Sequence, residues 1–497
     1  MRPAVAPFVL NAPQRATPFA ALRLSALVLW AVWVGFASTT QHVSNDFWLQ
    51  VRIGELISQQ HAIPQTLLFP FTEIATARFN AHEWLPSLAA SWFVKHLGEA
   101  FLPVLSGMLG LALFFLVLRL AFQRSGQHIA CALGLAALAL VVENFRHELR
   151  PELLALFALQ VCLWCLHSLP THPRWAAVVY LLTTALWSNT HGSFVLAPAL
   201  LICCGVGAWL DAQNSHGAPW QPYAFLAPLA GLATLVTPFG LEQWQFVLGF
   251  SSQSQAKLLL GEWRPTWDIS LHVLRGWWIG LAALALTWAV VLRHWQRVPW
   301  RDLMVWLLFT VLALKAVRFL AYAGLGAAFV LAPLARKEGS VQIAREAKQL
   351  AIVLLFALMA WALVLRFGNA FGAYPTSLAG PPRLSKPMVQ LVQHPTLQGP
   401  VLNSYSLGAE LIYRGYPRMR PSIDSRIDSY GDAYFFAHEA LWTAPQRLEA
   451  FVQRYGVRYA LLDPDDWATV QQYHSLDPAR WRMLLMDSRA VMLERKP

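Results

Sequence analysis

Charged side chains are scarce in this sequence. Of its 497 residues only 13% are Asp, Glu, Lys or Arg, whereas 56% are hydrophobic, and the mean hydropathy is +0.42. This composition excludes an ordinary soluble fold, which needs far more polar surface. Apolar runs of about 20 residues recur along the chain, and a helix needs that length to cross a bilayer. We therefore expect a polytopic α-helical membrane protein.

Cysteine is equally rare, with five residues in the chain, and all five fall inside apolar segments. Cys162 and Cys165 have the spacing of a CxxC motif, but hydrocarbon lacks the polar partners and the water that thiol exchange needs. We interpret the cysteines as small packing residues. The sequence therefore predicts no disulfide framework.

The chain also lacks a basic stripe and, in its polar C-terminal part, a glycine-rich phosphate-binding motif. The formal net charge of +11 comes from Lys and Arg residues in short loops. This distribution does not predict a nucleic-acid partner. Without the glycine-rich motif, the fold expected for the C-terminal part does not by itself imply a nucleotide.

About eleven membrane spans are expected. They lie near residues 18–40, 101–121, 129–142, 152–169, 175–188, 193–210, 222–237, 277–294, 303–316, 320–335 and 349–367. The first has no small-residue cleavage site, so we expect a retained anchor. The loops with most positive charge fall on one side, which the positive-inside rule assigns to the cytoplasm. The N-terminus is then cytoplasmic, and the chain after about residue 366 lies outside.

Two kinds of structure are predicted on the outer side. Residues 47–59 and 85–97 have helical periodicity, and such amphipathic segments lie flat on a membrane surface. Beyond residue 370, short strands alternate with helical runs and a closing hairpin at 483–494, which favours a small α/β domain. We therefore divide the chain into a membrane domain, 1–368, which includes the outer-loop helices within 41–100, and an extracytoplasmic α/β domain, 369–497.

Ionisable residues mark the outer ends of the spans. Asp46 follows the first span, and the pair His82-Glu83 returns to the same surface. Charged groups at membrane depth are costly and usually mark a functional site. Four cationic residues lie on this outer side, where the positive-inside rule disfavours positive charge: Arg146, Arg150, Lys315 and Arg318. They either extend to lipid headgroups or together hold an anionic ligand.

The sequence resembles the bacterial GT-C-type glycosyltransferases, specifically an uncharacterised group with a first-loop pattern D-x-W-W-H-L…G…I-P…D-P-F-S…H-E-W-L. The matching pieces are 45–72 with Ala81–Leu85, Arg150-Pro-Glu152, Trp187–Gly192, Thr237–Gly240, Glu262-Trp263, Asn403–Tyr405 and Asp424–Gly431. Two departures occur in the first loop. Phe47–Gln50 stands in place of Trp-Trp-His-Leu, and Leu67–Phe71 in place of Asp-Pro-Phe-Ser, so one His and one acidic residue are absent.

The resemblance implies an enzyme of the bacterial cytoplasmic membrane. GT-C enzymes move a sugar from a polyprenyl-phosphate carrier to a glycan, lipid or protein acceptor on the outer face, usually with inversion. Such a transfer needs a carboxylate as general base, for which Asp46 is the candidate. The departing phosphate needs cations, for which Arg318, Lys315 and Arg150 are candidates, and His82 could also donate.

Each candidate also has a structural interpretation. Asp46 could cap the helix that follows it, and His82-Glu83 could hold the loop against Trp84, unless Glu83 orients His82 or lies beside the acceptor. Asn189 and His191 either pack between helices or contact substrate. The acidic and basic residues at 424–428 form a local ion-pair cluster or grip an acceptor.

Two questions stay open at this stage. Asp46, His82 and Glu83 could converge on a divalent cation, although no spacing requires it. The function also has two alternatives: a transporter or flippase for a lipid-linked or anionic solute, and a non-catalytic GT-C scaffold. The chain shows no internal repeat of the kind that transporters carry, whereas the two departures in the first loop keep the scaffold open as an alternative.

Overall fold

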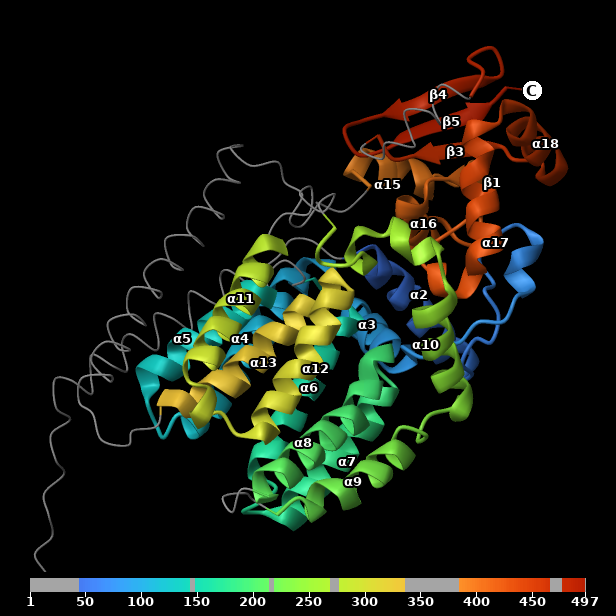
Figure 1. Cartoon of the computed structure of the whole chain (residues 1–497). Helices are drawn as coiled ribbons and strands as arrows, with labels where there is room; N and C mark the ends of the chain where they lie inside the picture. Colours follow the sequence, from blue (N-terminus) through green and yellow to red (C-terminus); the bar gives the residue numbers. More distant parts are fainter. Residues whose placement is uncertain are drawn as a thin grey trace, which may run out of the picture.

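A computed structural model describes residues 44–143, 148–213, 219–268, 277–335, 384–464 and 476–496. The described chain forms a bundle of apolar helices and a small domain with a β-sheet, which packs on one end of the bundle (Figure 1). The predicted spans at 18–40 and 349–367, the predicted domain boundary at 368/369 and Arg146 lie outside the described residues. The fold class expected from the sequence is confirmed.

Nine helices in the described residues match nine of the predicted spans. They are α4 Leu102–Arg124, α5 Ile129–Glu143, α6 Pro151–Ser168, α7 Pro173–Ser188, α8 Leu196–Gln213, α9 Gln221–Ala233, α11 Trp277–Arg293, α12 Trp300–Lys315 and α13 Leu320–Leu331. Four segments are long and apolar enough to cross a membrane by length and composition: Glu99–Arg124, Pro151–Ser168, Gly192–Gln213 and Val317–Ala335. The chain is therefore a multi-pass membrane protein, and the total of about eleven spans stays a prediction.

A buried ion-pair cluster holds the end of the bundle farthest from the sheet domain. Arg124 and Asp302, each 1% exposed, pair at 2.5 Å, and Arg301 pairs with the other oxygen of Asp302 at 3.0 Å. Asp211 accepts hydrogen bonds from the backbone N–H groups of Trp300 and Arg301, at 2.8 and 3.1 Å, and so caps α12. Arg124 and Arg301 belong to the positively charged loops that the sequence predicts on one side, and the structure brings both to Asp302.

Helix α2, Asn45–Gln60, lies between the bundle and the sheet domain (Figure 1). Trp48 and Val51 are buried in the bundle core, whereas Leu49 and Ile53 are buried in a second core that includes residues of the sheet domain. The sequence predicted that this segment lies flat on the membrane, but its apolar side chains are covered by protein on both sides. Helix α3, Trp84–Leu97, packs against α2. Helix α10, Leu241–Gln253, comes between the bundle helices α9 and α11 in the chain.

The C-terminal part is the predicted α/β domain. Its strands are β1 Gly399–Asn403, β2 Met419–Pro421, β3 Tyr459–Leu462, β4 Trp481–Met486 and β5 Val491–Arg495, and its helices are α15 Lys386–Gln393, α16 Gly408–Gly415, α17 Ile427–Glu439 and α18 Pro445–Tyr455. The sheet order is β2-β1-β3-β5-β4. The first three strands are parallel, and β5 and β4 form the expected antiparallel hairpin. Helices α15 and α17 were not predicted.

Arginine side chains attach the sheet domain to the membrane domain. Arg414 on α16 makes two hydrogen bonds to Glu99, at 2.6 and 2.8 Å. Arg426 donates to the backbone oxygen of Leu67 at 2.8 Å, and Arg420 donates to backbone oxygens of the same loop. The segment that follows β2 is therefore fixed above α2. Loops after the carboxyl ends of parallel strands commonly carry function, and this one faces Asp46.

Candidate active site

Asp46 lies in the first turn of α2 and contacts Arg150, the residue that precedes α6. One Asp46 carboxylate oxygen is 3.2 Å from an Arg150 Nη atom, and Ser425 of the sheet domain also forms a hydrogen bond with Asp46. No side-chain capping bond is made at the start of α2. Burial raises the pKa of Asp46, and Arg150 opposes this rise. The side chain is 38% exposed, so solvent still reaches the carboxylate.

Arg150 and Arg318 are linked through shared carboxylates. Glu262 lies 3.5 Å from Arg150 and 3.3 Å from Arg318, and Glu152 lies 3.9 and 3.2 Å from the same two residues. The Arg318 guanidinium also lies over the Trp263 ring, 4.4 Å from its centroid. The two predicted cations are therefore brought together, and shared carboxylates contact both side chains.

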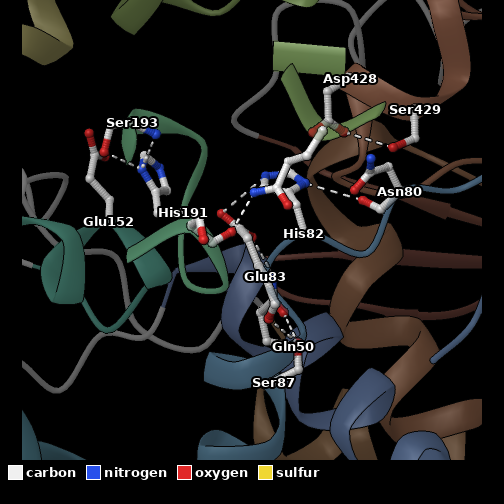
Figure 2. Close-up of polar contacts among 12 residues, drawn as sticks. Gln50, Asn80, His82, Glu83, Ser87, Glu152, His191, Ser193, Asp428 and Ser429 are labelled. Atoms are coloured by element: carbon white, nitrogen blue, oxygen red, sulfur yellow. Dashed lines mark hydrogen bonds and ion pairs between the residues drawn. The ribbon is translucent and has the colours of Figure 1, made fainter. Parts of the chain in front are cut away.

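His82 and Glu83 form a second group at the start of α3 (Figure 2). The His82 Nδ1 atom is 3.2 Å from the backbone oxygen of Asn80, which makes Nδ1 the protonated nitrogen of a neutral ring. Nε2 is 3.9 Å from Glu83, whose other oxygen accepts a 2.6 Å hydrogen bond from Gln50. Gln50 in turn accepts a hydrogen bond from Ser87.

Burial shifts the pKa values of this pair in opposite directions. It lowers the pKa of His82, and nearby Asp428 opposes the shift. For Glu83, burial together with Asp428 and Asp46 raises the pKa well above its ordinary value. Both groups therefore favour their neutral forms. The influence of Asp46, Arg150 and Arg318 on Glu83 shows that the two groups belong to one electrostatic unit.

His191 lies on the bundle side of this unit. Its Nδ1 atom accepts a hydrogen bond from the backbone N–H of Ser193 at 3.2 Å and is 2.8 Å from the Ser193 Oγ atom, so the ring caps the short helix that begins at Gly192. Burial lowers its pKa to about 3. Figure 2 shows Glu152 beside it. His191 is therefore a neutral ring at the border of the arginine network.

The Asn189 side chain makes its hydrogen bonds within the protein. Its Oδ1 atom accepts a hydrogen bond from Trp84 at 2.9 Å, and its Nδ2 atom donates to the backbone oxygens of Ala185 and Val236 at 2.8 and 2.7 Å. This amide joins the start of α3 to the end of α7. Lys315 is exposed at the end of α12, close to Lys257, whose pKa is lowered by burial and by Lys315.

Several members of the site were not predicted from the sequence. Glu148, Glu152 and Glu262 pair with Arg150, although two of them stand in quoted motifs. The sheet domain adds Ser425 and also Tyr405, whose hydroxyl donates to the Ser425 backbone oxygen at 2.8 Å. The hydrophobic pattern carries no signal for such contacts. The motifs Arg150-Pro-Glu152 and Glu262-Trp263 were the available indications.

The tail cluster at 424–428 has two parts. Asp424 and Arg426 form a buried pair at 2.6 Å, and Tyr430 donates to Asp424 at 2.8 Å. This part is the predicted local ion pair. The other part is Asp428, which accepts a hydrogen bond from Ser429 at 3.1 Å and acts electrostatically on His82 and Glu83. The sheet domain therefore contributes to the site directly.

Within the described ranges, no three His, Cys, Asp or Glu side chains are arranged to hold a metal ion. Asp46 faces Arg150, whereas Glu83 faces Gln50, so these two carboxylates are engaged separately. The residues present do not form a ready cation site. A divalent cation stays a prediction.

Comparisons with known proteins identify the fold. No family model and no curated protein matches the sequence. The apo oligosaccharyltransferase of Archaeoglobus fulgidus is similar in structure, with a TM-score of 0.55 and 14% identity over 90% of this chain and 70% of that one. The same enzyme, AglB, with an inhibitory peptide and a dolichol-phosphate gives 0.55 and 14% over 89% and 69%. Apo ArnT from Cupriavidus metallidurans gives 0.52 and 14% over 96% and 98%. The chain has the GT-C fold.

Proposed function

We propose that this protein is a membrane glycosyltransferase. It moves a sugar from a polyprenyl-phosphate carrier to a glycan, lipid or protein acceptor on the outer face of the bacterial cytoplasmic membrane. The observation that carries the proposal is the solvent-reached carboxylate of Asp46 beside Arg150, which is linked to Arg318 through shared carboxylates. The fold supports it, since an archaeal protein of the same fold was solved with a dolichol-phosphate and a peptide.

The proposed chemistry is an inverting displacement. Asp46 takes the proton of an acceptor hydroxyl or amine, and the freed electron pair forms the new bond at the anomeric carbon. The bond between that carbon and the phosphate oxygen breaks, and its electrons remain on the polyprenyl phosphate. Arg150 and Arg318 lie close enough together to stabilise this added charge. Since both are positioned by Glu152 and Glu262, they need no rearrangement to do so.

An open apolar groove beside the site suits the hydrocarbon chain of the carrier. It encloses about 500 Å³ and is lined by Trp84, Leu85, Leu182, Ala185, Leu186, Asn189, Val236, Thr237 and Pro238. Leu182, Leu186 and Val236 are more than half exposed. Trp84, which lines the groove, directly follows His82-Glu83, so a lipid in this groove lies beside the site. Apolar exposure of this extent marks a lipid or ligand surface.

The direct test compares Asp46→Asn with the wild type. We expect the variant to lose about 10³-fold in transfer, because an amide cannot accept the proton, while the protein still inserts and folds. Asp477→Asn makes the same chemical change at an exposed position of the sheet domain and should be fully active. Mass spectrometry of lipid-linked and envelope glycans, in cells with and without the protein, identifies the sugar and the acceptor. Full transfer by Asp46→Asn would remove Asp46 from the mechanism.

The two alternatives predict different results. A transporter or flippase would move solute across reconstituted vesicles without forming a glycosylated product. In the described residues the ionisable groups gather at the two ends of the bundle rather than along a path through it, which does not favour transport. A non-catalytic scaffold would bind glycan or protein through its sheet domain and be indifferent to Asp46.

A further inference from the structure

Asn80 is a buried side chain whose amide makes no hydrogen bond to the described part of the protein. The residue is 5% exposed, and both the Nδ2 and Oδ1 atoms lack a partner. Buried amides are almost always satisfied, because an unsatisfied one loses its bonds to water without replacement. An orphaned donor and acceptor on the same side chain therefore point to a missing hydrogen-bonding partner.

The surroundings of Asn80 are polar and come from two parts of the molecule. Its backbone oxygen lies 3.2 Å from His82, and Figure 2 shows Asn80 near His82, Asp428 and Ser429. Asp428 lies in the first turn of α17 in the sheet domain and acts electrostatically on both His82 and Glu83. The first outer loop and the sheet domain thus place an amide, an imidazole and a carboxylate together.

His82 also faces the helix bundle. A Cβ atom at Gly192 would lie 3.8 Å from His82 Nε2, so the ring nitrogen that carries no proton is directed toward this turn. The same nitrogen is 3.9 Å from Glu83. At these distances Nε2 makes no hydrogen bond, and it can accept one from a ligand.

We propose that Asn80, His82 and Asp428 form a subsite that binds the hydroxyl groups of a sugar ring. A hydroxyl group both donates and accepts hydrogen bonds, and the Asn80 amide can accept one through Oδ1 and donate one through Nδ2. Asp428 and Nε2 of His82 can each accept a hydrogen bond from a hydroxyl group. A phosphate would be repelled by Asp428 and is expected at Arg150 and Arg318 instead. This inference rests on the proposed function, and the sugar is either that of the donor or that of the acceptor.

The test uses the full-length protein in lipid nanodiscs and measures binding of undecaprenyl phosphate that carries glucose or mannose, and of undecaprenyl phosphate alone. If the donor sugar occupies the subsite, Asn80→Ala binds the sugar-bearing lipids about tenfold more weakly, as expected from one lost hydrogen bond, and binds the bare lipid unchanged. If the acceptor occupies it, donor binding is unchanged and the KM for octyl glucoside or octyl mannoside rises about tenfold.

Thermal unfolding separates this role from a structural one. Because the Asn80 amide makes no bond within the described protein, Asn80→Ala should unfold at the same temperature as the wild type or higher. Asn403→Ala is the matched control, since the Asn403 amide bonds to Ser422 and to two backbone oxygens. This control should unfold at a lower temperature.

Two outcomes overturn the subsite. One is an Asn80→Ala variant with unchanged affinity for both lipids and unchanged KM. The other is a variant that unfolds earlier and loses affinity for the bare and sugar-bearing lipids equally, which is the behaviour of a structural residue. Either result leaves the Asp46→Asn test untouched. By contrast, a wild-type protein that neither binds nor turns over any sugar lipid contradicts the proposed function itself. If the alanine variant does not accumulate in cells, Asn80→Ser replaces it in the same measurements.

Discussion

At the scale of single residues, the site depends on the contact between Asp46 and Arg150. Burial favours the neutral carboxylic acid of Asp46, whereas the guanidinium favours the carboxylate, and the net result is a raised pKa. A general base works in its ionised form, so transfer should rise with pH as Asp46 loses its proton. The raised pKa places this acidic limb at higher pH than for an ordinary aspartate.

Replacement of Arg150 by Gln should shift the acidic limb of the pH–rate profile to still higher pH. The charge that favours ionised Asp46 is then lost, while burial remains, so the pKa of Asp46 rises again. The measurement is kcat/KM against pH with a saturating acceptor. Arg174→Gln, at an exposed position at the start of α7, makes the same change and should leave the profile in place. An unshifted limb in Arg150→Gln would assign the titration to another group.

At the scale of elements, the close approach of α2 and α3 positions His82 and Glu83. Gly54 lies against the turn at Ser87, and a Cβ atom at Gly54 would be 2.0 Å from the Ser87 backbone oxygen. Ser87 also bonds to Gln50, which holds Glu83. A shift between the two helices therefore displaces His82 and Glu83.

Gly54→Ala should destabilise the protein by about 1–3 kcal/mol, the usual cost of overpacking a close contact. Transfer should fall as well, because α3 must move away from α2. Gly231→Ala on α9 is the matched control: nothing lies within 4 Å of the added Cβ, so helix propensity leaves it neutral or slightly stabilised. Denaturant unfolding and a transfer assay measure both effects. Equal stability of the two variants would show that the α2–α3 contact relaxes freely.

The same scale shows what the sequence could predict. Apolar periodicity predicted the described helices of the bundle, α2 and α3, and alternating strands predicted the sheet, because burial acts locally on each element. Helix α17 was missed because Gly431, with a φ of 74°, interrupts it and its first turn is polar. The contacts of Ser425 with Asp46 and of Glu262 with Arg150 were missed because these residues come from distant segments, and sequence spacing does not record such tertiary contacts.

For the whole molecule, the decisive contact is the attachment of the sheet domain. Arg414 bonds to Glu99 with two nitrogens and lies over the Trp48 ring, 4.6 Å from its centroid. The fork geometry of arginine matches a carboxylate in a way that lysine does not. Since Asp428 and Ser425 are carried by the sheet domain, this attachment determines whether the site is complete.

Arg414→Lys should loosen the domain and reduce transfer several-fold, more so at high salt, where the remaining charge attraction is screened. Hydrogen exchange should increase in α16 and in the segment after β2. Arg482→Lys is the control, because Arg482 pairs with Glu494 at 2.5 Å on the exposed surface of the same domain, 63% exposed itself. Unchanged exchange and transfer in Arg414→Lys would show that the apolar contacts of α2 suffice to hold the domain.

The placement of α17 has a consequence for biosynthesis. Asp46 and Arg150 belong to the early part of the polypeptide, whereas Asp428 follows every described helix of the bundle. The ribosome must therefore translate most of the messenger RNA before Asp428 is present to complete the site. Nascent chains already inserted in the bilayer thus carry Asp46 and Arg150 but not Ser425 or Asp428. The group of residues around Asp46 and His82 is therefore complete only after the whole chain has been made and its last domain has docked.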